Sequence, residues 1–197
     1  MVTMNKIKEL GRRFFVRPVA RVLIAARIHP NYITVSSLFF GIIAFFLYFR
    51  GSFLLAAVFV FLSGILDTFD GEVARRLKVV SKVGAFLDST IDRVNEFLAY
   101  MGMFCFYMRH QPSVTYWVLV AIFGSLMVSY TRARAEGIGI SPQVGMFERF
   151  TRLVFIIAGS VFGPGIMVYG LIILAVGTIG TMIQRIIYVL VHRDPGA

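Results

Sequence analysis

The chain has 197 residues, 58% of them hydrophobic, with a mean hydropathy of +0.80 and a net charge of +10. This composition is too apolar for an ordinary soluble domain, and a single cysteine excludes disulfides and cysteine-based metal sites within one chain. The basic residues stand beside apolar segments, where anionic lipid head groups would meet them. The charge therefore indicates a membrane surface and argues against nucleic acid as a partner.

Residues 5–21 alternate basic and apolar positions. This pattern predicts an amphipathic helix on the cytoplasmic membrane surface, and a basic tail that only sets orientation is the alternative. We predict one domain over residues 1–197, in which 1–28 form the juxtamembrane amphipathic segment and 29–197 form a six-helix bundle.

Six apolar segments approach the ~20 residues that cross a bilayer. They predict transmembrane helices at residues 32–50, 53–75, 84–107, 114–134, 148–163 and 166–191. Lys and Arg concentrate in the N-terminal segment, after the second and fourth helices, and at the C-terminus, which places both termini in the cytoplasm. The predicted fold class is all-α integral membrane, with six transmembrane helices plus an N-terminal amphipathic cytoplasmic surface helix.

Acidic residues concentrate in the second and third predicted helices. Asp67 and Asp70 share a helix face at spacing i, i+3, and Asp88 and Asp92 share one at i, i+4. The connection between the two helices is short, so they are antiparallel neighbours. We therefore expect the four aspartates to converge near the cytoplasmic ends of these helices.

Four carboxylates beside hydrocarbon repel one another and are costly to bury. Divalent cations resolve both problems, and an all-oxygen ligand set favours Mg²⁺, Mn²⁺ or Ca²⁺ over zinc. Ion pairs with Arg75, Arg76 and Arg93 are the structural alternative. Gly71 and Gly84 permit close approach of a ligand, and Arg75, one turn from Gly71, is placed to meet a phosphate. The stretch predicts a metal site for a diphosphate.

Taken in order, these residues resemble the signature of the CDP-alcohol phosphotransferase (CDP-alcohol phosphatidyltransferase) family, D-x-x-D-G-x-x-A-R-x8-G-x3-D-x3-D. The match is complete: Asp67, Asp70, Gly71, Ala74, Arg75, Gly84, Asp88 and Asp92. Such enzymes transfer the phosphate of a CDP-linked lipid to an alcohol and release CMP. The resemblance implies the same reaction here, in a homodimer whose active site faces the cytoplasm.

The resemblance also implies residue roles. Asp67, Asp70 and Asp88 would hold two metal ions, Mg²⁺ or Mn²⁺, with Asp92 contributing to one and acting as general base on the acceptor hydroxyl. The segment HPNYIT at 29–34 resembles the family's entry to the first helix, whose backbone N–H groups would meet the nucleotide; an ordinary helix start is the alternative. The implied CDP-lipid residues are Asn31, Tyr32, Ile33, Thr34, Gly71, Ala74, Arg75, Ser81 and Gly84.

Arginines bracket the loop after the fourth predicted helix, and they suggest a pocket for an acceptor that carries a phosphate: Arg132, Arg134, Arg149 and Arg152. Their alternative explanation is the positive-inside rule. The patterns S-Y-x-[K/R]-A-R-A-E and G-x-x-E-R-x-x-R are similar to the branch of the family that makes phosphatidylinositol phosphate or archaetidylinositol phosphate, whose acceptor is inositol 1-phosphate. Arg185 could add a further positive charge.

We therefore predict a multi-pass transferase of the cell membrane that uses CDP-diacylglycerol or CDP-archaeol and inositol 1-phosphate among membrane lipids. Glycerol 3-phosphate as acceptor and CDP-inositol as donor are alternatives within the enzyme class. A cation transporter is the alternative from another class, because intramembrane acids often mark ion paths. The helices beyond residue 96 carry no acid at depth, which favours the enzyme.

Overall fold

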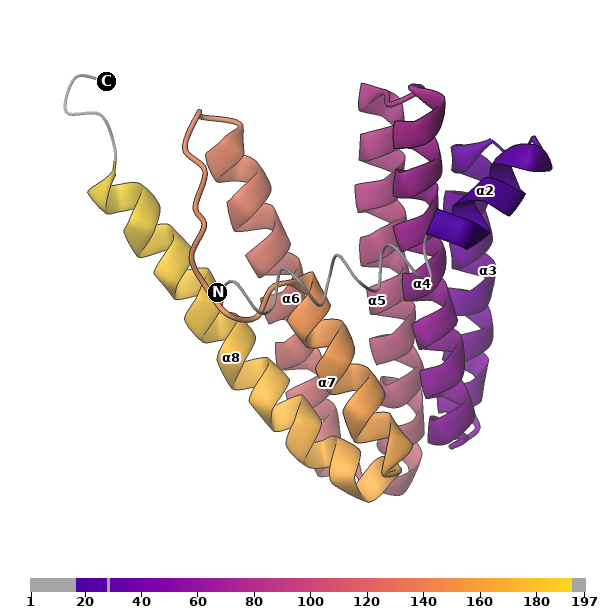
Figure 1. The fold of residues 1–197 in the computed structure, drawn as a ribbon. Helices are drawn as coiled ribbons and strands as arrows, with labels where there is room; N and C mark the ends of the chain where they lie inside the picture. Colours follow the sequence, from indigo (N-terminus) through magenta and orange to yellow (C-terminus); the bar gives the residue numbers. More distant parts are fainter. Residues whose placement is uncertain (1–16, 28, 193–197) are drawn as a thin grey trace.

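A computed structural model describes residues 17–27 and 29–192, and these residues form helices without any strand. The helices are α2 (Arg17–Ala25), α3 (Pro30–Phe49), α4 (Phe53–Leu77), α5 (Lys82–His110), α6 (Thr115–Glu136), α7 (Arg149–Val161) and α8 (Pro164–Val191), with a short 3-10 turn, η2 (Pro112–Val114), before α6 (Figure 1). Each of the six predicted membrane helices coincides with one of α3 to α8, and the ends agree within three residues. The all-α prediction is confirmed. Residues 1–16, which hold most of the predicted surface helix, lie outside the described residues.

The helix ends follow from local chemistry around the predicted site. Pro30 opens α3, where its fixed φ suits the first helical position and its missing N–H costs nothing. Lys78 ends α4 in the left-handed conformation at φ 57°. Ser81 then caps α5 by accepting a hydrogen bond from the Gly84 N–H. Only residues 78–81 separate the two helices, which makes them antiparallel neighbours as predicted.

Four helical segments are long and apolar enough to cross a membrane: α3, α4, residues 112–136 (η2 with α6) and α8. They make the chain a multi-pass membrane protein. Helix α5 has the length but carries more charge, since both Asp88 and Asp92 lie on it. Helix α7 has 13 residues, or roughly 20 Å, against a hydrocarbon core of about 30 Å.

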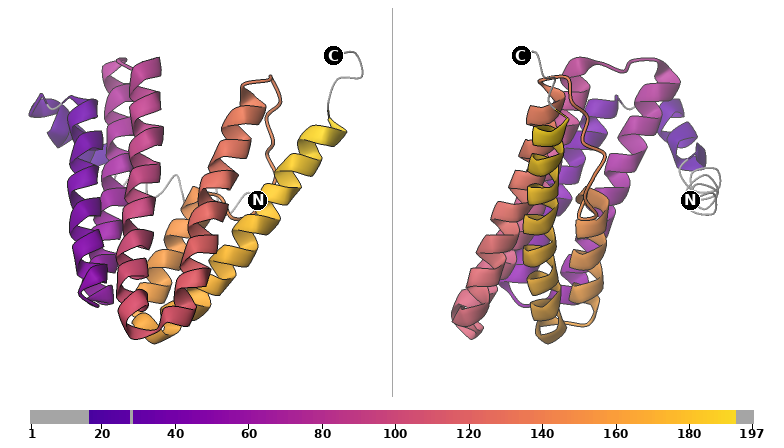
Figure 2. Two further views of the ribbon diagram at one scale, coloured as in Figure 1. Left: turned by 180° about the vertical axis from the view of Figure 1, so that it is seen from behind. Right: turned by 90° about the vertical axis from the view of Figure 1, so that its left-hand side faces the viewer.

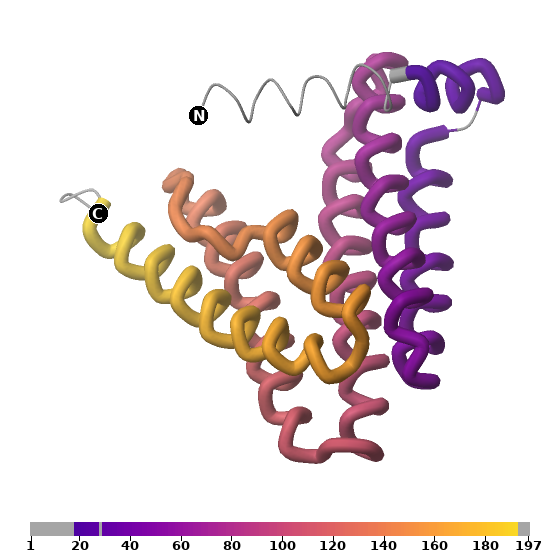
Figure 3. Tube along the Cα trace, turned by 60° about the horizontal axis from the view of Figure 1, so that its bottom comes forward, coloured from indigo at the N-terminus to yellow at the C-terminus, as the bar shows by residue number. Residues whose placement is uncertain are grey.

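The helices form two groups that converge at one end of the molecule and diverge at the other. Helices α3, α4 and α5 stand side by side, whereas α6 and α8 form the second group (Figure 2). Helix α7 packs against both α4 and α8 and so joins the groups (Figure 3). The wider end is the one at which α4 ends and α5 begins, which is where the predicted site lies.

Helix α7 begins inside the bundle instead of at its end. The segment of residues 137–148 leaves the end of α6 and runs back along α8 before α7 starts (Figure 1). The Phe147 N–H donates to Thr181 Oγ1 of α8 at 3.2 Å. Gly145 has a φ of 97°, and a Cβ at this position would collide with the Thr181 side chain. This close passage carries Arg149, the first residue of α7, down to the level of the acids on α4 and α5.

Candidate active site

The four aspartates come together from two helices, as the spacing predicts. Asp67, Asp70 and Asp88 each present one carboxylate oxygen, and these oxygens lie within 4.8 Å of one another. Asp88 Oδ1 is buried and has no hydrogen-bond partner among the described residues. A buried acceptor without a donor calls for an additional partner, and hard divalent cations bind carboxylate oxygens at such a cluster. The residues therefore fit a divalent metal ion.

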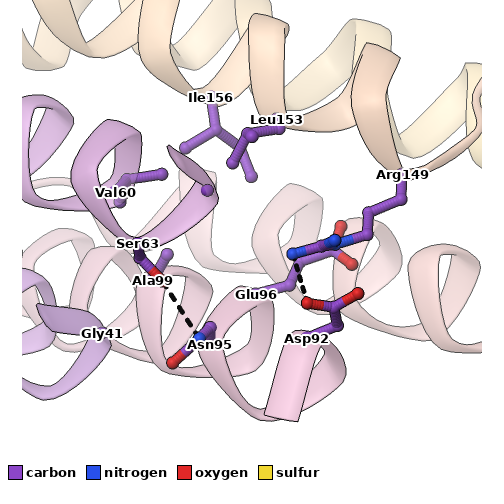
Figure 4. Close-up of a pocket in the computed structure, with 11 residues that line it drawn as sticks. Gly41, Val60, Ser63, Asp92, Asn95, Glu96, Ala99, Arg149, Leu153 and Ile156 are labelled. Carbon is purple, nitrogen blue, oxygen red and sulfur yellow. Dashed lines mark hydrogen bonds and ion pairs between the residues drawn. The ribbon is translucent and has the colours of Figure 1, made fainter. Parts of the chain in front are cut away.

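Two side chains from other helices contact the acids. Thr34 Oγ1 on α3 donates a hydrogen bond of 2.5 Å to Asp70 Oδ2, which orients this carboxylate. Arg149 on α7 forms ion pairs with two of the aspartates. Its Nη1 lies 2.7 Å from Asp67 Oδ2, and its Nη2 contacts Asp92 Oδ1. Figure 4 shows the Arg149 guanidinium directed at Asp92 between α5 and α7.

The alternative explanation of the acids was ion pairs of the aspartates with Arg75, Arg76 and Arg93. None of these three arginines forms a salt bridge with an aspartate within the described residues. Arg75 and Arg76 pair with Glu72 on their own helix, at 3.4 Å and 2.9 Å. Arg93 donates to the Ser89 carbonyl and makes no salt bridge within the described part of the chain. Arg149, which we predicted for the acceptor, is the arginine that contacts the acids. One guanidinium leaves most of the negative charge of four aspartates uncompensated.

A cavity of about 280 Å³ lies beside the acids, between the first turn of α3, the end of α4 and the start of α5. Asp70 and Asp88 form part of its wall, so the cavity opens directly onto the acid cluster. Seven of the nine predicted CDP-lipid residues line it: Asn31, Thr34, Gly71, Ala74, Arg75, Ser81 and Gly84. Tyr32, which is 71% exposed, and Ile33, which is buried against Phe69 and Val73, do not.

The cavity suits an anionic ligand. The Arg75 side chain is 52% exposed and its contact with Glu72 is long, at 3.4 Å, so its remaining donors can meet a phosphate. The first turn of α3 adds the positive end of the helix dipole, while its Asn31 and Tyr32 N–H groups bond to His29 Nδ1 and to the His29 carbonyl at 3.3 Å and 3.0 Å. Gly71 leaves room beside Arg75, because a Cβ at this position would lie 3.2 Å from Arg75 Nη1.

The predicted acceptor arginines do not converge on one point. Arg132 is exposed and pairs with Glu136 at 2.9 Å and with Glu148 at 3.7 Å. Arg134 is exposed and lines a separate cavity of about 190 Å³ with Arg185. The spacing i, i+2 accounts for this divergence, since such residues point to different faces of a helix.

Arg152 is buried, with 1% of its side chain exposed, and its guanidinium is fully engaged. Its Nε and Nη2 lie 2.6 Å and 2.7 Å from the two oxygens of Glu96 on α5, and its Nη1 donates to the Phe147 carbonyl at 3.0 Å. In this arrangement Arg152 holds α7 against α5. Sequence reasoning missed Glu96 as the partner, although its position one turn beyond Asp92 on the same face was a usable signal.

Arg185 is also buried, with 2% of its side chain exposed. It donates to the Val144 and Val128 carbonyls at 3.1 Å and 2.7 Å, and its Nη2 lies 3.3 Å from Glu148 Oε1. These contacts tie the 137–148 segment to α6 and α8. Glu148 therefore lies between Arg132 and Arg185, immediately before Arg149, and sequence reasoning did not give it a role in the site.

Comparison with known proteins identifies the family of this chain. The family model for CDP-alcohol phosphatidyltransferase matches residues 27–187. The archaetidylinositol phosphate synthase of Methanothermobacter thermautotrophicus is 37% identical over 94% of this chain and 93% of its own length. A phosphatidylinositol phosphate synthase of Streptomyces avermitilis is 36% identical over 93% of this chain and 82% of its own length.

The solved structures of phosphatidylinositol phosphate synthase from Mycobacterium tuberculosis have the same fold. The structure with CDP-DAG bound has a TM-score of 0.83 and 26% identity, over 92% of this chain and 96% of that one. The structure in complex with manganese and citrate has a TM-score of 0.85 and 27% identity, over 92% and 91%. The sequence signature, the acid cluster and these similarities agree, and the chain belongs to the CDP-alcohol phosphatidyltransferase family.

Proposed function

We propose that this chain transfers the phosphatidyl or archaetidyl group of a CDP-linked lipid to a hydroxyl of inositol 1-phosphate and releases CMP. The observation that carries the proposal is the cavity between α3, α4 and α5, whose wall includes Asp70 and Asp88. A nucleotide diphosphate in it would bring its phosphates to the acids. The relatives named as synthases of archaetidylinositol phosphate and phosphatidylinositol phosphate support the acceptor.

In the proposed donor complex, Arg75 and the first turn of α3 bind the diphosphate, while Gly71, Ala74 and Gly84 leave the room that it needs. Tyr32 and Ile33 would contribute through the backbone of this first turn, since their side chains point elsewhere. The CDP-DAG-bound relative supports a CDP-linked lipid as donor. Because this cavity takes the diphosphate in the proposed complex, it does not select the length or the linkage, ester or ether, of the lipid chains.

We propose that Asp67, Asp70 and Asp88 hold two divalent cations, Mg²⁺ or Mn²⁺, with Asp92 contributing to one. The unpartnered Asp88 oxygen and the manganese complex of a relative support a divalent metal. When bound, such ions neutralise the diphosphate and the charge that develops on the departing CMP. Thr34 holds the Asp70 carboxylate in place for them through its hydrogen bond.

Asp92 is the proposed general base. Its side chain is 9% exposed and lies on α5 one turn beyond Asp88. It lines a small cavity between α4, α5 and α7, together with Arg149. From this position it would take the proton of the acceptor hydroxyl, which then attacks the phosphorus of the lipid-linked phosphate. As the new P–O bond forms, the phosphoanhydride P–O bond to CMP breaks and CMP leaves with its electron pair, while the proton stays on Asp92 Oδ until it passes to solvent.

For the acceptor, we propose that Arg132, Arg134 and Arg149 supply positive charge to its phosphate. Arg152 would support them by holding α7 in place, because Glu96 and the Phe147 carbonyl already engage its donors. One end of the bundle holds the end of α4, the start of α5 and the end of α6 (Figure 2). The proposed donor and acceptor sites therefore open to the same side.

We further propose a six-span arrangement in which α5 and α7 complete the four apolar helices, in the cell membrane, with the termini and the site facing the cytoplasm. The basic residues at the site's end of the bundle support this orientation: Arg75, Arg76, Lys78, Lys82, Arg132 and Arg134. A homodimer remains a prediction from the family resemblance.

The proposal is tested by CMP release from purified protein in detergent with Mg²⁺, using CDP-diacylglycerol and CDP-archaeol as donors. Inositol 1-phosphate, free inositol and glycerol 3-phosphate are compared as acceptors. Release that requires inositol 1-phosphate is the expected result. Release with glycerol 3-phosphate alone would contradict the proposed acceptor, and no release with any donor and acceptor would contradict the proposed reaction.

A further inference from the structure

Arg149 occupies the place of a cation within the acid cluster. Its guanidinium spans two helices, with Nη1 at 2.7 Å from Asp67 on α4 and Nη2 in contact with Asp92 on α5. Figure 4 shows the contact with Asp92. Asp67 is also one of the three acids whose oxygens lie within 4.8 Å of one another. Arg149 and a divalent cation held by these three acids would therefore share the Asp67 carboxylate. Two positive groups at one carboxylate repel each other, so they bind there in competition.

The backbone around Arg149 is held on both sides, which leaves its side chain as the movable part. Before it, the Phe147 N–H is bonded to Thr181 of α8 at 3.2 Å. One turn after it, Arg152 forms the buried pair with Glu96. The Arg149 side chain itself is 34% exposed, and it can change rotamer without moving α7.

Further charged side chains gather around Glu148, the residue before Arg149. Glu148 precedes Arg149 and lies 3.7 Å from Arg132 Nη1 and 3.3 Å from Arg185 Nη2. In this group Arg132 and Arg185 pair with two acids, Glu136 and Glu148. A guanidinium that leaves the aspartates and joins the group would give it a net positive charge. Such a group is suited to a ligand with a phosphate.

We propose that Arg149 is an internal counter-cation that holds Asp67 and Asp92 in the metal-free protein and leaves them when a divalent cation binds. Once released, its guanidinium completes the site for the phosphate of the acceptor. This second half of the proposal rests on the proposed function. Metal binding would thereby prepare the acceptor site, so that the metal is bound before the acceptor. Arg149 acts here as a positioning residue toward the metal and as a binding residue toward the acceptor.

The first test measures Mn²⁺ binding to the full chain in detergent by isothermal titration calorimetry, without lipid or acceptor. Arg149→Gln removes the competing charge and should tighten Mn²⁺ binding by about tenfold, the effect of losing one charge-assisted hydrogen-bonded contact. Arg93→Gln is the matched control, because Arg93 adjoins Asp92 in sequence but donates to the Ser89 carbonyl and faces α6. Its Mn²⁺ affinity should equal that of the wild type.

Unchanged or weaker Mn²⁺ binding by Arg149→Gln would overturn the proposal. Equally tighter binding by Arg149→Gln and Arg93→Gln would also overturn it, because this result would indicate a general effect of net charge. Arg149→Lys retains the positive charge and serves as a second control, in case Arg149→Gln does not fold. It should bind Mn²⁺ like the wild type, and a lysine variant that binds as tightly as Arg149→Gln would also overturn the proposal. Because no turnover is measured, this result is independent of the CMP assay.

The second test measures inositol 1-phosphate binding with and without saturating Mn²⁺. Wild type and Arg93→Gln should gain about tenfold in affinity with Mn²⁺, corresponding to one released charge-assisted contact. Arg149→Gln should gain less, because it has no guanidinium to release. An equal gain in Arg149→Gln would overturn the acceptor half of the proposal and leave the metal half to the first test.

Discussion

Asp92 and Asp88 lie one turn apart on α5, yet their surroundings differ. Asp88 presents a buried oxygen without a partner among the described residues, whereas Asp92 contacts Arg149 and lines the small cavity at the start of α7. The first environment suits a metal ligand and the second suits a group that meets the acceptor. The spacing i, i+4 predicts that the two share a face, but it does not separate their roles.

Asp92→Asn preserves the size of the side chain and its contact with Arg149 but removes the proposed base. We expect the rate of CMP release to fall by about 100-fold or more, the usual contribution of general base catalysis. Binding of CDP-diacylglycerol, measured by calorimetry, should remain close to that of the wild type. Turnover at the wild-type rate would refute the assignment of Asp92 as base.

Gly71→Ala tests the close approach of the donor. The new methyl group would lie 3.2 Å from Arg75 Nη1, the end of a flexible side chain, so the helix should fold while the cavity narrows. We expect KM for the CDP-lipid to rise by about fivefold, which corresponds to an overpacking cost near 1 kcal/mol. Gly180→Ala on α8 is the control, because a Cβ there meets nothing within 4 Å; a KM increase of the same size in both variants would rule out a local effect.

Helix α7 owes its position to contacts with its neighbours more than to its own length. It has 13 residues and begins within the bundle, and the Arg152–Glu96 pair ties it to α5. An ion pair so deeply buried is costly to break from one side, because the remaining charge loses its partner. The same pair sets Arg149, one turn earlier, opposite Asp67 and Asp92.

Arg152→Met should destabilise the protein by about 3–5 kcal/mol, since it leaves Glu96, whose side chain is only 14% exposed, without its partner. Thermal unfolding in detergent measures the effect. The double variant with Glu96→Leu replaces both charges by apolar groups and should recover most of the stability. If the double variant is stable but no longer binds inositol 1-phosphate while CDP-lipid binding persists, Arg152 contacts the acceptor directly, contrary to the supporting role proposed here.

Most of the exposed basic residues in the described part of the chain lie at the wide end of the bundle, where α4 ends and α5 begins, whereas Arg50 and Arg109 lie at the other end. Opposite this end, the connection between α5 and α6 contains η2 and exposed Ser113. Exposed Ser141 lies in the 137–148 segment. The positive-inside rule places the wide end in the cytoplasm, and a labelling experiment can test this orientation.

In a Cys105→Ser background, Ser113→Cys should react with a membrane-impermeant maleimide in intact cells. Ser141→Cys should react only after the cells are permeabilised, because its segment faces the cytoplasm. Labelling is measured by the mass shift of the purified protein. The opposite pattern would reverse the proposed orientation. Equal labelling of both variants in intact cells would contradict the placement of the two positions on opposite sides of the membrane, with α6 between them.

The sequence by itself determined the helical membrane class, the ends of α3 to α8 and the convergence of four aspartates. These features depend on hydropathy, helical periodicity and a short connection, all of which are local. It also determined most of the lining of the cavity between α3, α4 and α5, because the signature residues sit at fixed spacing on α4 and α5, and the first turn of α3 follows from Pro30.

Only the tertiary structure decided which groups the arginines contact. Arg149 contacts Asp67 and Asp92, and Arg152 pairs with Glu96, across more than fifty residues of chain. Residue spacing could not show this, because the 137–148 segment carries α7 into the bundle before it begins. The depth at which a helix starts in the bundle depends on packing against distant helices, and this depth decides which groups its arginines reach. A local sequence pattern therefore does not distinguish an arginine that pairs with acids from one that is available to bind a phosphate.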